Sequence, residues 1–417
     1  MPLLSPPRRK CSKPISYHEF VALAVALMAT NSLTLDTMLP ALPDIGHGLK
    51  IADPRALPLI VTAFLIGLGG AQVAYGPLAD RYGRRPILLL GLSGYVFFAV
   101  AGALASDFKM LIVLRILQGA TVAATRVVAT SIVRDCYSGR QMARVMSVVM
   151  MAFLSIPVLA PSLGRILMIF MSWRGLFMSL ALFGAIVLVW ATWRLPETLA
   201  PSMRRPLAPR TVFQGFHAVL SHRVALGYIL AMTALSGATY GFVTSVQPLF
   251  AVTFRVPDKM PVVFASVSGM MGVASLVNSR VVERFGTRIV SHGALLCFIT
   301  LELAHLRIAI TNHESLAVFA IFQSLAMFAF GLISTNFGAM ALEPLGHVAG
   351  TAASVLGFFS MVGGGAIGMF IAESSHGTVL PVVLGFAANG VIALFFTLVA
   401  EGGTLFISPG QAAASVK

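Results

Sequence analysis

Two ionisable residues lie well inside apolar stretches of the sequence, where a charge is costly. Asp36 falls in the outer half of the first stretch, and Arg115 falls in the fourth. Burial in hydrocarbon favours the protonated form of a carboxyl group, whereas a nearby cation favours the ionised form. A carboxyl group held between these limits can take up and release a proton. We therefore predict that Asp36 exchanges a proton. The alternative is a carboxylate that reaches interfacial water near Pro40.

Other polar residues within apolar stretches are candidates for lining a substrate cavity. Arg126 follows Arg115 by about three helical turns and so projects from nearly the same face of the helix. Two stacked cations would suit neutral or anionic substrates. Such residues can equally serve as contacts between helices. The candidate cavity residues are Gln118, Arg126, Tyr240, Gln247, Gln323 and Asn336.

A further polar group comprises Glu302, His305 and Arg307, near the end of a later apolar stretch. Its position predicts a cluster at the membrane interface rather than a functional site.

No arrangement of residues suggests an enzyme. The sequence lacks a phosphate-binding glycine-rich loop, and none of the nine His residues is placed with Glu or Cys at metal-ligand spacing. The three cysteines are far apart and are expected to be incidental thiols. We therefore expect no metal, no cofactor and no use of ATP.

Composition places these residues in a membrane. Of the 417 residues, 57% are hydrophobic and 11% are charged, whereas soluble domains carry about a quarter charged residues. A span needs about 20 mostly apolar residues. Such runs lie near 18–41, 57–78, 87–106, 110–133, 142–168, 174–193, 223–248, 260–281, 289–309, 315–341, 346–371 and 379–400. The fold class predicted is an all-α membrane protein with twelve transmembrane helices.

The positive charges indicate how these helices are oriented. Of the 29 Lys and Arg residues, 19 fall in alternate segments that include the N-terminus, 8 fall in the other segments, and 2 lie within spans. Cytoplasmic loops carry an excess of Lys and Arg, so both termini are expected to be cytoplasmic. The net charge of +14 is then explained by topology, and nucleic acid is not an expected partner.

An internal repeat divides the chain into two halves. DRYGRR, which begins at Asp80, recurs as ERFGTR at Glu283, an offset of 203 residues. Two equivalent six-helix halves are one known transporter architecture; the alternative is coincidence between two basic loops. We predict an N-terminal bundle over 1–193, a cytoplasmic linker over 194–222 and a C-terminal bundle over 223–417.

The segment GPLADRYGRRP, from Gly76 to Pro86, resembles the loop between the second and third spans of the major facilitator superfamily. Further segments resemble the drug:proton antiporters of the bicyclomycin-resistance (Bcr/CflA) type. These segments are DTMLPALP, RILQGATVAA, IVRD, LAPSLG, LPET and ALEPLGHVAGTAAS. The resemblance implies the major facilitator fold and transport by alternating access.

The resemblance also implies roles for single residues. Asp36 matches the acid of the antiporter motif, while Met28 occupies the place where some relatives carry a second acid. Arg115 matches a residue of proton coupling, although a structural role is the alternative. A helix bend is expected at Pro157, Pro161 and Gly164, followed by Arg165 where a small residue is usual.

The resemblance also implies that this superfamily loop acts as a latch that stabilises the outward-facing state. Asp80 should meet the N-terminus of the eleventh span, and Arg84 is placed to pair with Asp135. The alternative is that these charges only mark the cytoplasmic boundary. The predicted latch consists of Gly76, Asp80, Arg81, Gly83, Arg84, Arg85 and Asp135.

The function predicted is proton-coupled efflux of small hydrophobic compounds by a protein of the bacterial inner membrane, most simply a monomer driven by the proton gradient. Two alternatives remain open: a proton-coupled metabolite symporter of the same fold, and a membrane sensor that does not transport.

Overall fold

The computed structural model describes residues 16–53, 56–137, 139–204, 209–311, 313–375 and 377–406. Both ends of the chain lie outside the described residues. The prediction that both termini are cytoplasmic therefore concerns residues that the structure does not describe. Some side chains within described helices, Pro157 among them, are not described either. All regular secondary structure in the described part of the chain is helical.

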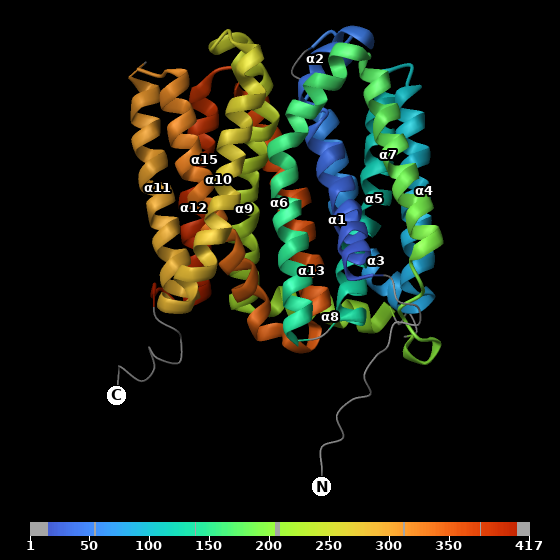
Figure 1. Cartoon of the computed structure of the whole chain (residues 1–417). Helices are drawn as coiled ribbons and strands as arrows, with labels where there is room; N and C mark the ends of the chain where they lie inside the picture. Colours follow the sequence, from blue (N-terminus) through green and yellow to red (C-terminus); the bar gives the residue numbers. More distant parts are fainter. Residues whose placement is uncertain are drawn as a thin grey trace, which may run out of the picture.

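The described residues form twelve long helical rods, whose arrangement is shown in Figure 1. The first six are α1 (Tyr17–Asp36), α3 (Leu59–Tyr82), α4 (Arg84–Ala103), α5 (Phe108–Cys136), α6 (Gly139–Phe170) and α7 (Trp173–Arg194). The last six are α9 (Arg223–Pro248), α10 (Met260–Phe285), α11 (Thr287–Ile310), α12 (Leu316–Leu342), α13 (Ala349–Phe358) continuing through η7 (Phe359–Gly363) into α14 (Gly364–Ser375), and α15 (Val379–Glu401). We call these two sets the N-terminal half and the C-terminal half.

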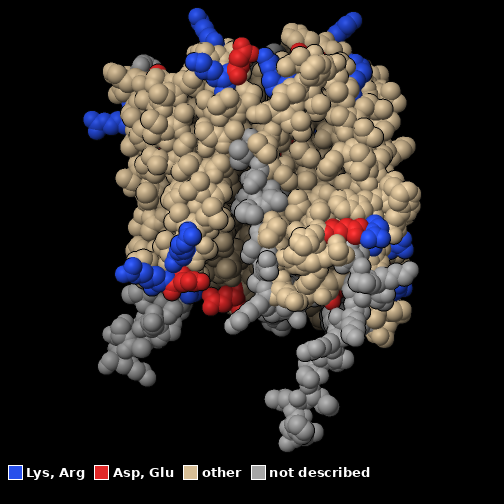
Figure 2. Space-filling model, viewed as in Figure 1, with Lys and Arg blue, Asp and Glu red and all other residues tan. Residues whose placement is uncertain are grey.

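The rods are long and apolar enough to cross a bilayer. Eleven candidate spans are present among the described residues, and α6 contributes a shorter apolar helix, Leu159–Phe170. Figure 2 shows a broad uncharged belt with the charged side chains gathered towards its two ends. The predicted all-α, twelve-helix membrane fold is confirmed, and each predicted span overlaps one rod.

Short helices mark the two sides of this belt. Helix α8 (Pro209–Ser221) and η3 (Pro201–Met203) belong to the segment that joins the halves. We call their side, at the bottom of Figure 1, the linker side. On the opposite side, η1 (Leu39–Ala41) and α2 (Leu42–Gly48) follow α1, and η5 (Pro257–Lys259) precedes α10.

The sequence repeat corresponds to a repeated turn. Helix α3 ends at Tyr82 and α4 begins at Arg84; 203 residues later, α10 ends at Phe285 and α11 begins at Thr287. The glycines between them, Gly83 and Gly286, have φ of 105° and 81°. Glycine adopts such positive φ values without steric cost. The two motifs therefore form the same helix–turn–helix connection in each half.

The halves pack together unevenly along their length. Gly357 of α13 lies so close to α3 that a Cβ at this position would overlap the Gln72 side chain. Nearer the linker side, a Cβ on Gly76 of α3 or on Gly350 of α13 would have no neighbour within 4 Å. The halves are thus in close contact at mid-depth, whereas Gly76 and Gly350 nearer the linker side have open space beside them.

Candidate functional site

Asp36 is the last residue of α1 and is buried, with 4% of its surface exposed. The α-helix stops here because Pro40 follows within the next turn, and the chain continues into the tighter η1. Among the described residues, none donates a hydrogen bond to the Asp36 carboxylate or forms an ion pair with it. The side chain is therefore a buried acid without a fixed partner, rather than one that reaches the surface.

Helix α6 approaches α1 next to this acid. A Cβ on Gly164 would overlap the main-chain oxygen of Thr37 and crowd Pro40. Only glycine permits this distance, so Gly164 fixes how closely α6 packs beside Asp36. Pro161 is buried in the same helix. Helix α6 is continuous from Gly139 to Phe170, and the bend expected from its prolines stays a prediction.

Arg115 of α5 is fully buried and connects three helices. Its Nε donates to the Ile60 main-chain oxygen of α3 at 3.2 Å, and one terminal nitrogen donates to the Thr34 oxygen of α1 at 3.5 Å. The other terminal nitrogen donates to Gln118 Oε1 at 2.9 Å. The guanidinium carbon also lies 4.5 Å from the centre of the Phe64 ring, a favourable cation–π distance.

None of these partners is a carboxylate, so the structure does not place Arg115 in contact with Asp36. The guanidinium instead binds the α1 backbone two residues before Asp36. Arg115 can therefore influence the acid by holding α1 in place. Gln118, a candidate cavity residue, is fully buried and occupied by Arg115.

Two buried hydrogen bonds from α1 were not anticipated. Asn31 donates to Thr125 Oγ1 at 2.7 Å, and the Thr34 and Tyr95 hydroxyl groups are 2.7 Å apart. The sequence held a signal for them, because Asn31 and Thr34 interrupt the apolar run that leads to Asp36. With Arg115, these contacts bind α1 to α3, α4 and α5.

Tyr240 connects this region to the C-terminal half. It lies on α9, and its hydroxyl group is within electrostatic range of both Arg126 on α5 and Asp36 on α1. Tyr240 therefore experiences the charges of two predicted residues from the other half. An acid, a cation and a phenol facing one interface can bind a polar group of a ligand or pass a proton.

The remaining candidate cavity residues are dispersed. Asn336 of α12 donates to Asn278 Oδ1 of α10 at 2.7 Å, a contact within the C-terminal half. Gln323 is buried, and neither polar atom of its side chain has a hydrogen-bond partner in the described chain. Gln247 borders a hollow of about 30 Å³ on the opposite side, together with Pro40 and Arg165. These three residues do not face a common cavity.

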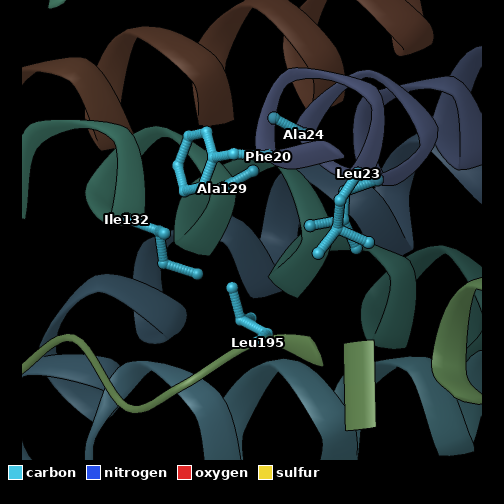
Figure 3. Close-up of a pocket in the computed structure, with 7 residues that line it drawn as sticks. Phe20, Leu23, Ala24, Ala129, Ile132 and Leu195 are labelled. Atoms are coloured by element: carbon cyan, nitrogen blue, oxygen red, sulfur yellow. The ribbon is translucent and has the colours of Figure 1, made fainter. Parts of the chain in front are cut away.

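A second hollow lies inside the N-terminal half (Figure 3). It is apolar, measures about 10 Å³ and is lined by Phe20, Leu23, Ala24, Leu27, Ala129, Ile132 and Leu195. A space of this size holds no more than one water molecule. It is a packing gap, and neither hollow is large enough for a substrate.

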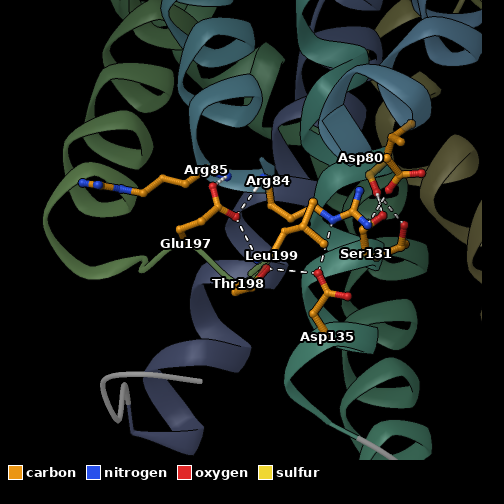
Figure 4. A network of polar contacts seen from close by, with 10 residues as sticks. Asp80, Arg84, Arg85, Ser131, Asp135, Glu197, Thr198 and Leu199 are labelled. Atoms are coloured by element: carbon orange, nitrogen blue, oxygen red, sulfur yellow. Dashed lines mark hydrogen bonds and ion pairs between the residues drawn. The ribbon is translucent and has the colours of Figure 1, made fainter. Parts of the chain in front are cut away.

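Three of the predicted latch residues, Asp80, Arg84 and Asp135, meet at the linker side of the N-terminal half (Figure 4). The Arg84 guanidinium lies between two carboxylates, 2.7 Å from Asp80 and 3.2 Å from Asp135. The expected Arg84–Asp135 pair is therefore present. No described contact joins Asp80 to α13, and the space beside Gly76 is open. Arg81 is exposed, with its guanidinium carbon 5.2 Å from the Tyr82 ring centre.

Glu197, which the predicted site did not include, completes this cluster. Its carboxylate accepts hydrogen bonds from the backbone N–H groups of Arg84 at 2.9 Å and Arg85 at 3.2 Å. A carboxylate at a helix N-terminus satisfies free N–H groups and the helix dipole. The Arg85 side chain donates to the Thr192 oxygen at 2.6 Å. The start of α4 is thus tied to the end of α7.

Comparison with known proteins identifies the family. The sequence model of the Major Facilitator Superfamily matches residues 21–369. The chain belongs to the Major Facilitator Superfamily.

Relatives within the superfamily cover most of the chain. A bicyclomycin resistance protein homolog of Haemophilus influenzae is 28% identical over 86% of this chain and 90% of its own length. Multidrug resistance protein D of Escherichia coli is 27% identical over 82% of this chain and 86% of its own. The resemblance to the bicyclomycin-resistance type is therefore confirmed, and the relatives are transporters rather than enzymes.

Solved structures share the superfamily fold. The human organic anion transporter MFSD10 has a TM-score of 0.70 at 19% identity, covering 93% of this chain and all of that one. A D-xylose-proton symporter has a TM-score of 0.72 at 16% identity, covering 94% of this chain and all of that one. These likenesses concern the fold alone.

Against the superfamily pattern, Arg165 stands out and has a partner. Its guanidinium lies 2.5 Å from the Asp258 carboxylate in η5, so an ion pair joins the two halves on the opposite side. Both side chains are exposed. Arg165 also borders the small hollow beside Gln247. The residue that departs from the family motif therefore contributes to closing this side of the molecule.

Proposed function

We propose that the chain is a proton-coupled efflux transporter, an antiporter for small hydrophobic compounds. It works by alternating access in the bacterial inner membrane, with both termini in the cytoplasm. The proton gradient supplies the energy, no cofactor is needed and the monomer is the working unit. The names of the relatives, which refer to bicyclomycin and multidrug resistance, support the substrate class.

The observation that carries this proposal is the state of Asp36. Its carboxylate is buried, has no hydrogen-bond donor among the described residues and lies within electrostatic range of Tyr240 across the interface. An isolated buried carboxylate is unstable when ionised, so it binds a proton. A substrate that brings polarity or water to this interface favours release of that proton. Binding of substrate and of proton then exclude each other, as antiport requires.

The uneven packing of the halves supports the proposed cycle. Close contact at mid-depth and on the opposite side, with open space beside Gly76 and Gly350 nearer the linker side, suits an inward-facing state. In the outward-facing state the linker side closes, and α13 approaches Asp80 and Gly76. Asp80 would then exchange part of its interaction with Arg84 for the N-terminus of α13, where a negative charge is favoured.

The deciding experiment compares two Asp→Asn variants. Asp36→Asn keeps the shape of the side chain but cannot ionise, so efflux driven by a pH gradient should fall to background. Asp44→Asn is the matched control, because Asp44 lies eight residues later and is exposed in α2. Resistance in a pump-deficient host identifies a substrate, and the pH-driven efflux of that substrate from vesicles is then measured for each variant.

The outcomes separate the alternatives. Gradient-driven efflux by Asp36→Asn at the wild-type rate would remove Asp36 from the mechanism. Antiport removes the substrate from the cytoplasmic side. Proton-driven accumulation of the substrate on that side would instead establish a symporter. Substrate candidates can also be added to the purified protein. If none of them causes release of a proton, a sensor would be favoured.

A further inference from the structure

A second group of titratable residues is buried in the C-terminal half, far from Asp36. Glu302 and His305 are one turn apart on α11, and Glu314 lies in the loop before α12. His305 Nε2 is 3.2 Å from Glu314 Oε1, and His305 Nδ1 is 3.7 Å from Glu302 Oε2. The imidazole thus lies between two carboxylates.

Burial differs from what the sequence predicted for this group. The side chains of Glu302 and His305 are completely buried and that of Glu314 is 12% exposed, whereas Arg307 is exposed. The expected interfacial cluster of Glu302, His305 and Arg307 is therefore wrong. Arg307 is two residues beyond His305, which places it on the other face of the helix.

The surroundings of the group are apolar. The His305 ring stacks on Phe322 with ring centres 4.8 Å apart, and the Phe319 ring centre is 6.1 Å away. Neither Glu302 oxygen has a hydrogen-bond partner in the described chain, and His305 Nδ1 also has none. A fully buried carboxylate without a donor is costly when ionised.

Charges from neighbouring helices do not offset this group. Helix α12 contributes the neutral Gln323. The one charged residue of α15 is Glu401, which pairs with Arg288 at 3.0 Å at the linker side. The charged residues of α10 are at its linker-side end, and Asp258 and Lys259 lie beyond its other end. Among the described residues, the ion-pair partner of both Glu302 and Glu314 is His305.

The charge balance determines what the group can bind. With both carboxylates ionised and His305 protonated, the net charge is −1. Uptake of one more proton makes the group neutral, which its apolar surroundings favour. The described His, Cys, Asp and Glu residues include no group of three or more suited to a metal ion, so the expected ligand is the proton.

Glu314, His305 and Glu302 lie at increasing depth from the opposite side of the membrane. Glu302 is eight residues before the end of α11 at Ile310, about 12 Å along the helix axis. Glu314 is at the opposite side and partly exposed. Gln323 is one turn beyond Phe319 along α12. Because α11 and α12 run antiparallel, Gln323 and Glu302 are both displaced from the His305–Phe319 contact towards the linker side.

We propose that Glu302, His305 and Glu314 form a second proton-binding site, in the C-terminal half, which is loaded from the opposite side through Glu314. A proton bound by Glu314 passes to His305 Nε2, and His305 Nδ1–H passes its proton to Glu302 Oε2. On discharge, Glu302 returns its proton to Nδ1 and Nε2–H is then released to Glu314, so the neutral ring regains its starting Nδ1–H tautomer. The 3.7 Å separation shortens to hydrogen-bond length during transfer.

Proton binding can be measured without transport. Infrared difference spectra between about pH 5 and about pH 9 report protonated carboxyl groups, a range that includes the ordinary titration of His. We expect full-length protein in lipid nanodiscs to show a carboxyl band that is lost in Glu302→Gln. The band should remain in Glu373→Gln, a matched control whose glutamate is exposed on α14. Identical spectra for the wild type and Glu302→Gln would overturn the proposal.

A second variant guards against misfolding of Glu302→Gln. Glu314→Gln alters the partly exposed end of the group and should shift the pH at which the Glu302 band appears. Glu302→Asp should retain a carboxyl band. Two further outcomes would overturn the proposal. In one, the wild-type band responds to added sodium but not to pH. In the other, the Glu302 band of Glu314→Gln appears at the same pH as in the wild type.

The use of this site in transport rests on the proposed antiport. Glu302→Gln is then expected to lower the number of protons exchanged per substrate, measured from the proton flux and substrate flux in vesicles. An unchanged proton-to-substrate ratio would remove the site from coupling. If Asp36→Asn retains gradient-driven efflux while the Glu302 band is present, the proposed mechanism fails and this inference stands. If the band is absent while Asp36→Asn abolishes efflux, only this inference fails.

Discussion

Arg165 and Asp258 form an ion pair 2.5 Å long that joins the end of α6 to η5, and so connects the two halves on the side opposite the linker. Beneath it, Gln247 borders a hollow of about 30 Å³. The pair crosses the interface between the halves, so opening of this side in the proposed cycle separates its two residues. The pair is exposed, and exposed ion pairs contribute about 0.2–1 kcal/mol. It is suited to adjust the balance between two conformations rather than to lock one of them.

Breaking this pair should open the opposite side. Arg165→Asp places two negative charges together, so labelling of Gln247→Cys by an impermeant maleimide should rise by up to about fivefold. The measurement uses oriented vesicles and a background in which Cys11, Cys136 and Cys297 are replaced by Ser. The exchange variant Arg165→Asp/Asp258→Arg should restore slow labelling. Equal labelling of all three proteins would mean that the pair has no effect on opening.

Gly164 should tolerate no side chain. In Gly164→Ala, the added Cβ overlaps the Thr37 oxygen and crowds Pro40, and overpacking of this kind costs about 1–3 kcal/mol. A lower melting temperature in detergent and weaker efflux are expected, because α1 next to Asp36 must shift. The control is Gly70→Ala, where a Cβ would have no neighbour within 4 Å. Equal melting of the two variants would show that α6 can move away freely.

Arg115 should not be replaceable by lysine. Lys keeps the charge but cannot reach α1, α3 and Gln118 at once, and hydrogen bonds to charged groups are worth about 1.5–3 kcal/mol each. Arg115→Lys should therefore melt at a lower temperature and lose efflux. Arg307→Lys changes an exposed arginine in the same way and should behave like the wild type. Full stability of Arg115→Lys would show that the position of α1 does not depend on the guanidinium.

Much of the fold could be predicted from the sequence, because the bilayer imposes a simple rule. Each span must be apolar for about 20 residues, so the rods appear directly in the residue pattern. The repeat at Asp80 and Glu283 was equally readable, since a turn with positive φ requires glycine at Gly83 and Gly286. Asp36 and Arg115 could be identified for the same reason, because charges within hydrocarbon are rare.

The tertiary structure alone decided which of these residues meet. Sequence gives the depth of a residue along a helix, but not which neighbouring helix its side chain faces. Gln118 could have lined a cavity, yet it binds Arg115. Glu302 could have reached the interface, yet helix packing buries it with His305. Arg165 was recognisable as unusual, but its partner Asp258 is 93 residues away and is determined only by how the two halves close.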